Sequence, residues 1–141
     1  AQWMDDVRWK QRFSNYSRAF ALLREILDSA DDIRAFEPIV KEGIIHRFEY
    51  TFELAWKTLK DKMLEDGIVV DLLSPKYVFK TAYQSKYIDS IEAWLRMAND
   101  RNLMSHTYDI ARFDEVLVRL KTEYYPLLDE LYGFLLEAHD E

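Results

Sequence analysis

The residues best suited to chemistry in this chain lie in the stretch DRNLMSHTYD, between Asp100 and Asp109. The imidazole of His106 has an ordinary pKa of about 6.5, so it can transfer protons near neutral pH. The guanidinium group of Arg101 keeps its charge and can bind two phosphate oxygens together. These are the groups that metal-independent RNA cleavage requires, because a 2′-hydroxyl must lose a proton as it attacks phosphorus, and negative charge then builds up on the phosphate.

The spacing of this pair sets a geometric condition. Arg101 and His106 are five positions apart, which separates them by about 140° around a regular α-helix. They can converge only if the helix ends or bends near Ser105, or if they meet across an interface. Asn102 lies beside the arginine and could orient either group or the phosphate.

The same residues also fit a purely structural role. Arg101 can pair with Asp100, with Asp109 or with the carbonyl end of a helix, and His106 can place a favourable positive charge at such an end. The serine, the threonine and Asp109 of the stretch are common turn residues and candidate N-caps of a following helix. Spacing alone leaves both interpretations open.

Composition limits the class of protein. The chain has 141 residues, 49% of them hydrophobic and 32% charged, which predicts one folded domain, 1–141, that is neither disordered nor fibrous. Nineteen basic against 26 acidic residues give a net charge of −7. This balance disfavours a broad phosphate-binding face, so any contact with nucleic acid must depend on a local basic cluster.

The sequence predicts no metal site and no cofactor. Cysteine is absent, which excludes disulfides and thiolate ligands. The histidines His46, His106 and His139 form no metal-binding spacing, and neither His46 nor His139 has a catalytic neighbour in sequence. No apolar run is long enough to cross a membrane and no apolar leader segment is present. We therefore expect a cytoplasmic protein without a membrane partner.

Helical periodicity runs through most of the chain. Apolar residues recur every three or four positions in five segments: Trp9 to Ser29, Ile39 to Glu65, Tyr77 to Tyr83, Ile88 to about Leu103, and Ala111 to Ala138. Gly67 is placed to end the second segment, and Ser74 with Pro75 forms a favourable start for the third. Pro126 lies inside the last segment and predicts a kink there rather than an end.

These segments predict an all-α fold. Three glycines and three prolines are too few for a many-turned β architecture. The stretch IVVDLLSP is expected to be a connector packed on the helices, because a single strand would have no partner. Four long helices with short connections predict an antiparallel up-and-down four-helix bundle, with a short additional helix between the second and third long ones.

Three blocks of the sequence carry a resemblance to a known family. Residues Arg101 to Tyr108 match the Arg-x4-His-x-Tyr pattern of HEPN-domain proteins of the HepT type. The block HRFEYTFELAWKTLK, together with RNLMSHTYD, resembles the small helical family of nucleotidyltransferase substrate-binding proteins. The block WKQRFSNYSRAFALL is similar to the opening helix of that family. The resemblance covers nearly the whole chain, and the three blocks together are far more specific than the short motif.

The resemblance implies a helical bundle that forms a homodimer and a complex with a small MntA-type nucleotidyltransferase encoded nearby. It also implies one of two functions. In the first, the chain is a toxin of a toxin–antitoxin pair, a metal-independent endoribonuclease acting on RNA, which the nucleotidyltransferase neutralises by AMPylation of a tyrosine. In the second, the chain is a non-catalytic subunit that presents a substrate to the nucleotidyltransferase. A helical dimer whose motif is only structural is a third interpretation.

Carried over by position, the resemblance makes Arg101 and His106 the catalytic pair, with Asn102 as the accompanying polar residue. It makes Tyr108 the acceptor of AMP. A homodimer also has a physical rationale here. Two Arg-His pairs that face each other across a twofold axis would double the positive charge of a shared cleft, which would offset the acidic balance locally.

Overall fold

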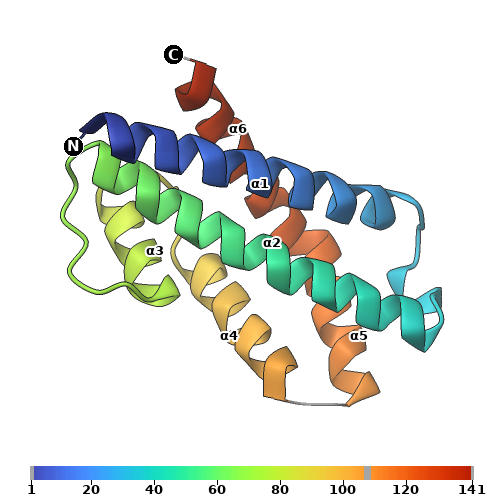
Figure 1. Cartoon of the computed structure of the whole chain (residues 1–141). Helices are drawn as coiled ribbons and strands as arrows, with labels where there is room; N and C mark the ends of the chain where they lie inside the picture. Colours follow the sequence, from blue (N-terminus) through green and yellow to red (C-terminus); the bar gives the residue numbers. More distant parts are fainter. Residues whose placement is uncertain (1, 107–108, 141) are drawn as a thin grey trace.

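The described part of the chain consists of helices and their connections. The computed structural model describes residues 2–106 and 109–140. The helices in chain order are α1 (Gln2–Asp28), a 3₁₀ turn (Ile33–Ala35), α2 (Pro38–Glu65), α3 (Pro75–Gln84), α4 (Glu92–His106), α5 (Ile110–Arg119), a π-helical turn (Leu120–Tyr124) and α6 (Tyr125–Asp140). The predicted all-α helical bundle with a short additional helix, α3, is confirmed (Figure 1).

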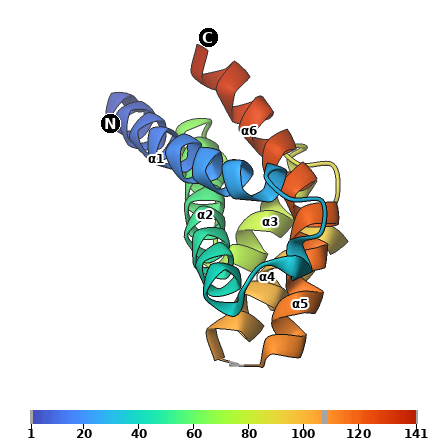
Figure 2. The same cartoon turned by 90° about the vertical axis from the view of Figure 1, so that its right-hand side faces the viewer.

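The helix α2 is the centre of this bundle. It lies alongside α1 in the opposite direction (Figure 1) and also contacts α3, α4, α5 and α6. The apolar residues that recur at helical spacing along α2 form a fully buried stripe, whose members are Phe48, Phe52, Ala55, Leu59 and Met63. Figure 2 shows α4 and α5 extending to one end of the bundle, whereas α6 lies near α1 at the other.

The end of the central helix follows from local backbone chemistry. At the end of α2, the Ile68 amide donates to the Met63 carbonyl at 2.9 Å and the Gly67 amide donates to the Leu64 carbonyl at 3.1 Å. Gly67 has a φ of +85°, and this combination is a Schellman motif, which favours glycine. The predicted end of the helix at Gly67 is confirmed.

The connector between α2 and α3 matches its prediction in part, because Val69, Leu72 and Leu73 are exposed rather than packed on the helices. Ile68 and Val70 pack on the core, and no strand is formed in this stretch. Ser74 then caps α3, because its hydroxyl accepts a hydrogen bond from the Tyr77 amide, and Pro75 occupies the first turn. Both roles were predicted from the sequence.

The helix α1 begins earlier than predicted, at Gln2 rather than near Trp9. The Trp9 side chain is buried, and its indole N–H donates to Asp6 at 3.2 Å. Lys10 forms an ion pair with Asp6 at 3.4 Å. These local contacts support the helix between Gln2 and Trp9. The outward apolar residues of this stretch do not continue the helical spacing that begins at Trp9, so the sequence did not predict it to be helical.

The limits of α4 differ from the prediction at both ends. The helix begins at Glu92 rather than Ile88, and it continues to His106 rather than ending near Leu103. The buried side chain of Met104 explains the extension, because it adds one more inward position to the helix. The consequence is that Arg101 and His106 lie on one uninterrupted helix.

The last long segment continues through Pro126, as predicted, but with a π-helical turn before it. The Tyr125 amide donates to the Leu120 carbonyl, five residues back. Pro126 has no amide hydrogen, and its ring crowds the carbonyl of the preceding turn, so an ordinary α-helical pattern is disfavoured there. No helix of the described residues is both long and apolar enough to cross a membrane.

Candidate functional site

Arg101 is held against α2. Its Nη2 donates to Glu53 Oε2 at 2.8 Å, and its Nη1 donates to Asn102 Oδ1 at 3.3 Å. The guanidinium carbon lies 5.7 Å from the ring centre of Phe52. The side chain is 27% exposed, so the charged group is fixed on several sides and still reaches solvent.

Asp100 does not pair with Arg101, contrary to one of the structural alternatives. It is buried and accepts hydrogen bonds from Arg119 Nε at 2.6 Å and from Arg119 Nη2 at 2.9 Å. It also accepts one from the Tyr124 hydroxyl. The pKa of Tyr124 is raised above its ordinary value, mainly by burial and next by this contact with the Asp100 carboxylate. The cluster anchors one side of α4, and Arg101 is therefore turned toward α2.

Glu53 connects several groups at the seam where α2 packs against α4. Its Oε2 accepts from the indole N–H of Trp56 at 3.1 Å, and its Oε1 pairs with Lys57 at 3.1 Å. Burial acts to raise the pKa of Glu53, but the hydrogen bonds from Trp56 and Lys57 and the positive charges of Lys57 and Arg101 outweigh it and lower the pKa from 4.5. Glu53 is therefore an anion at neutral pH.

A second contact between α2 and α4 defines how the two helices align. The Ser105 hydroxyl donates to Glu49 at 3.0 Å and to the Arg101 carbonyl at 3.1 Å. Glu49 and Glu53 are one turn apart on α2, as are Arg101 and Ser105 on α4. Glu49 pairs with Ser105, whereas Glu53 pairs with Arg101. The two helices are therefore antiparallel at this seam.

His106 lies on another side of α4. It is the last residue of the helix, and its side chain is exposed. In the region that the structure describes, no hydrogen bond or ion pair joins it to Arg101. Because α4 is regular to its end, Arg101 and His106 are separated by about 140° around the helix axis. The helix has no bend near Ser105 that would bring their side chains together. Asn102 is exposed and contacts Arg101.

Tyr108 and Asp109 follow His106 in the motif region. Tyr108, predicted as the AMP acceptor, lies outside the described residues. Asp109 caps α5 as one structural alternative predicted, because its side chain accepts a hydrogen bond from the Ala111 amide at 3.0 Å.

Glu49 and Glu53 were not predicted as parts of the site. Their sequence signal is a pair of acids four positions apart on one face of a helix, which usually indicates a solvated surface. Nothing in the sequence relates positions 49 and 53 to positions 101 and 105, because that relation depends on how two distant helices pack.

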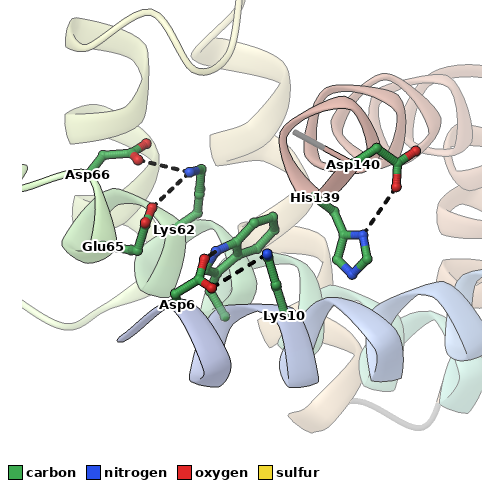
Figure 3. Close-up of polar contacts among 8 residues, drawn as sticks. Asp6, Lys10, Lys62, Glu65, Asp66, His139 and Asp140 are labelled. Carbon is green, nitrogen blue, oxygen red and sulfur yellow. Dashed lines mark hydrogen bonds and ion pairs between the residues drawn. The ribbon is translucent and has the colours of Figure 1, made fainter. Parts of the chain in front are cut away.

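A separate polar cluster lies near the far end of α2. Lys62 forms ion pairs of 2.8 Å with both Glu65 and Asp66 (Figure 3). Asp66 also accepts a hydrogen bond from the Tyr87 hydroxyl at 2.5 Å. Beside it is an open hollow of about 450 Å³, lined by Lys62, Asp66, Ser85, Lys86, Tyr87, Phe134, Glu137 and Ala138.

The histidines outside the motif have structural or solvent-exposed positions, as predicted. His139 on α6 pairs with Asp140 at 3.2 Å (Figure 3) and packs against the rings of Trp9 and Phe13. His46 is exposed on α2. Within the described ranges, no group of three or more acidic or histidine side chains is arranged to hold a metal ion.

Comparison with known proteins agrees with this fold. A solved structure from Thermus thermophilus is 30% identical, with a TM-score of 0.72, and the match covers 84% of this chain and 96% of that one. A curated protein of Haemophilus influenzae described as "probable ribonuclease HepT" is 31% identical over 70 residues, and the match spans 48% of each chain. The chain thus matches about half the length of that relative.

The family comparison covers far more of the sequence. Residues 11–137 match the model of the family described as nucleotidyltransferase substrate binding protein like. This range contains nearly all of the bundle, including the seam between α2 and α4 and the motif at the end of α4. The chain is therefore a member of the nucleotidyltransferase substrate-binding protein family, with a HepT-like relative.

Proposed function

We propose that this protein is a metal-independent endoribonuclease of the HEPN type, held in check by a small MntA-type nucleotidyltransferase. The observation that carries the proposal is the state of Arg101. Its guanidinium is oriented by Glu53 and Asn102, is partly open to solvent, and lies within two turns of the exposed His106. An oriented and partly exposed cation suits the binding of a phosphodiester, and His106 of the same chain lies on another side of α4.

The reaction assigns a separate task to each group. The 2′-oxygen of a ribose forms a bond to the adjacent phosphorus, and its proton passes to a histidine. The bond from phosphorus to the 5′-oxygen breaks, and that oxygen receives a proton from an imidazolium. Arg101 stabilises the negative charge that builds up on the phosphate oxygens. The products are a 2′,3′-cyclic phosphate and a free 5′-hydroxyl.

A homodimer would supply the second imidazole. One chain offers one motif histidine, and its position around α4 directs it away from its own arginine. In a twofold dimer with the ends of both α4 helices in one cleft, Arg101 of one copy could meet His106 of the other. One histidine would then accept the first proton while the other donates the second.

Control by the partner would act on Tyr108. Transfer of AMP from ATP forms a bond between the tyrosine oxygen and the α-phosphorus and releases pyrophosphate. The added phosphate would lie two residues from His106 and place a negative charge beside the cleft, which opposes the binding of RNA. RNA and the nucleotidyltransferase are therefore the two proposed macromolecular partners.

The central experiment measures cleavage of a short fluorescent RNA by the purified protein. We expect Arg101→Ala and His106→Ala each to lower the rate by about 10²- to 10⁴-fold. The matched control is Arg96→Ala, because Arg96 is also on α4 in an inter-helix ion pair, with Glu123. Cleavage at the normal rate by both Arg101→Ala and His106→Ala would refute the assignment.

The regulatory part is tested by intact mass. Incubation with the nucleotidyltransferase encoded next to this gene, ATP and Mg²⁺ should add one or more AMP units and abolish cleavage. The Tyr108→Phe variant should keep its original mass and its activity. Addition of AMP to Tyr108→Phe in the same amount would show that another residue is the acceptor.

A second function, a non-catalytic subunit that presents a substrate, is favoured by a different observation. The hollow beside Tyr87 and Phe134 combines aromatic walls with charges of both signs, from Lys62, Lys86, Asp66 and Glu137, which suits a small polar ligand. If the bundle presents such a substrate, Phe134→Ala should raise the KM of the nucleotidyltransferase for it. RNA cleavage would then be absent from the wild-type protein.

A further inference from the structure

The guanidinium of Arg101 is oriented mainly from α2. Arginine has five N–H donors in a planar fork. One Nη2 hydrogen is bonded to Glu53, 48 positions away in sequence, and one Nη1 hydrogen is bonded to the neighbouring Asn102. The Nε atom is buried without an acceptor among the described residues. Among the contacts of the described residues, one hydrogen on each Nη atom is left for a ligand.

Glu53 is itself restrained, so it can restrain another group. Its Oε2 bonds both the indole of Trp56 and the guanidinium of Arg101, while its Oε1 contacts the Lys57 ammonium. The ring of Phe52 lies beneath the guanidinium carbon. A carboxylate held at both oxygens has little freedom to follow a moving arginine. The position of the cation is thus set by the backbone of α2.

We propose that Glu53 is the positioning residue of the site, fixing the Arg101 guanidinium so that its two remaining Nη hydrogens are presented together to a phosphate. The proposal rests on the ribonuclease function proposed above and adds a residue on another helix. Glu53 does not contact the substrate. It acts through Arg101. Its negative charge weakens phosphate binding, whereas its hydrogen bond holds the guanidinium in the orientation that the reaction needs.

This double effect predicts a distinctive kinetic pattern. Loss of the carboxylate frees the guanidinium to take many orientations, and misplacement of a group by about 1 Å can slow a reaction by about 10²-fold. Removal of a negative charge beside Arg101 also strengthens its attraction for the phosphate. We therefore expect Glu53→Ala to lower kcat by about 10- to 100-fold while KM stays the same or falls.

The variants separate geometry from charge. Glu53→Gln keeps an acceptor oxygen near Arg101 and should retain more of kcat than Glu53→Ala. The matched control is Glu123→Gln, because Glu123 pairs with Arg96 on the same helix α4 and is exposed to a similar extent as Glu53. Glu123→Gln should leave kcat and KM at the wild-type values.

A spectroscopic measurement tests the restraint without any cleavage. In ¹⁵N-edited NMR spectra, the Nη hydrogens of a fixed arginine are resolved, whereas rapid rotation averages them. The Arg101 signals, assigned by their loss in Arg101→Lys, should be resolved in the wild type and in Glu123→Gln, and averaged in Glu53→Ala.

The two proposals can fail separately. A wild-type protein that cleaves no RNA overturns the ribonuclease function, and the NMR comparison then still decides whether Glu53 restrains Arg101. Equal averaging of the Arg101 signals in the wild type and in Glu53→Ala overturns the positioning role. An unchanged kcat in Glu53→Ala, or an equal loss in Glu123→Gln, overturns it as well.

Discussion

Replacement of Asp100 by alanine should destabilise the fold more than any change at the exposed ion pairs. The carboxylate is buried, and it accepts two hydrogen bonds from Arg119 and one from Tyr124. The Tyr124 side chain is 0% exposed, so its hydroxyl has no access to water when the acceptor is lost. Arg119 is 33% exposed, so water can solvate part of its charge.

The magnitude follows from this difference in exposure. A buried hydroxyl without a partner costs about 1–3 kcal/mol. The partly exposed guanidinium adds about 1 kcal/mol, because its interaction with the carboxylate is screened. We therefore expect Asp100→Ala to lower the free energy of unfolding by about 3 kcal/mol, which lowers Tm by about 10 °C for a chain of this size.

Urea unfolding monitored by circular dichroism, at one protein concentration for all variants, measures this effect. Asp129→Ala is the control, because it removes the carboxylate of an exposed pair with Arg24 and should change the stability by less than about 0.5 kcal/mol. In an Asp100→Ala background, Tyr124→Phe should restore about 1 kcal/mol by removing the unsatisfied hydroxyl. A loss below about 1 kcal/mol in Asp100→Ala, or no restoration by Tyr124→Phe, would refute the reasoning.

Three further predictions concern other polar contacts. Tyr16→Phe should lower the unfolding free energy by about 1–2 kcal/mol, since the buried Tyr16 hydroxyl donates to the Leu128 carbonyl at 2.6 Å; an unchanged urea midpoint would contradict this. Asp109→Ala should cost about 1 kcal/mol by removing the cap on the Ala111 amide at 3.0 Å, and Asp109→Asn should retain most of it in the same assay. Because the pKa of Glu53 is lowered in the folded protein, its carboxylate stabilises the fold above the unfolded pKa of about 4.3. This stability is lost as pH falls through the folded pKa. The difference in unfolding free energy between wild type and Glu53→Gln should therefore shrink from pH 7 to pH 3. If urea unfolding shows a difference in unfolding free energy that grows toward pH 3, this prediction is wrong.

The fold was predictable where the signal is local. The stripe from Phe48 to Met63 repeats at helical spacing, and this repeat is a property of the sequence alone. The same holds for the cap at Ser74 and the end of α2 at Gly67, which depend on residues within one turn. The end of α4 was less predictable, because the three residues beyond Leu103 continue the helix through a single buried contact, that of Met104.

The candidate site could be proposed from residue types, but its arrangement could not be predicted from the sequence. The motif made Arg101 and His106 candidates, and helix geometry gave the condition for their convergence, which the regular helix α4 does not meet within one chain. The partner of Arg101 was not among those considered, because Glu53 approaches from a helix 48 positions away. A contact of this kind is decided by the packing of α2 against α4, which Asp100 and Arg119 help to fix.

The π-helical turn Leu120–Tyr124 also bears on how the length of this chain can vary among homologues. A π-helical turn holds one residue more than an α-helical turn, so a deletion of one residue in that stretch would convert it into ordinary α-helix and leave the orientation of the flanking segments nearly unchanged. Arg119 before the turn reaches Asp100, while Leu128 after the turn receives the hydroxyl of Tyr16. Such a deletion would preserve both contacts, so a relative one residue shorter here can keep the same packing with an ordinary α-helix in place of the π-helical turn.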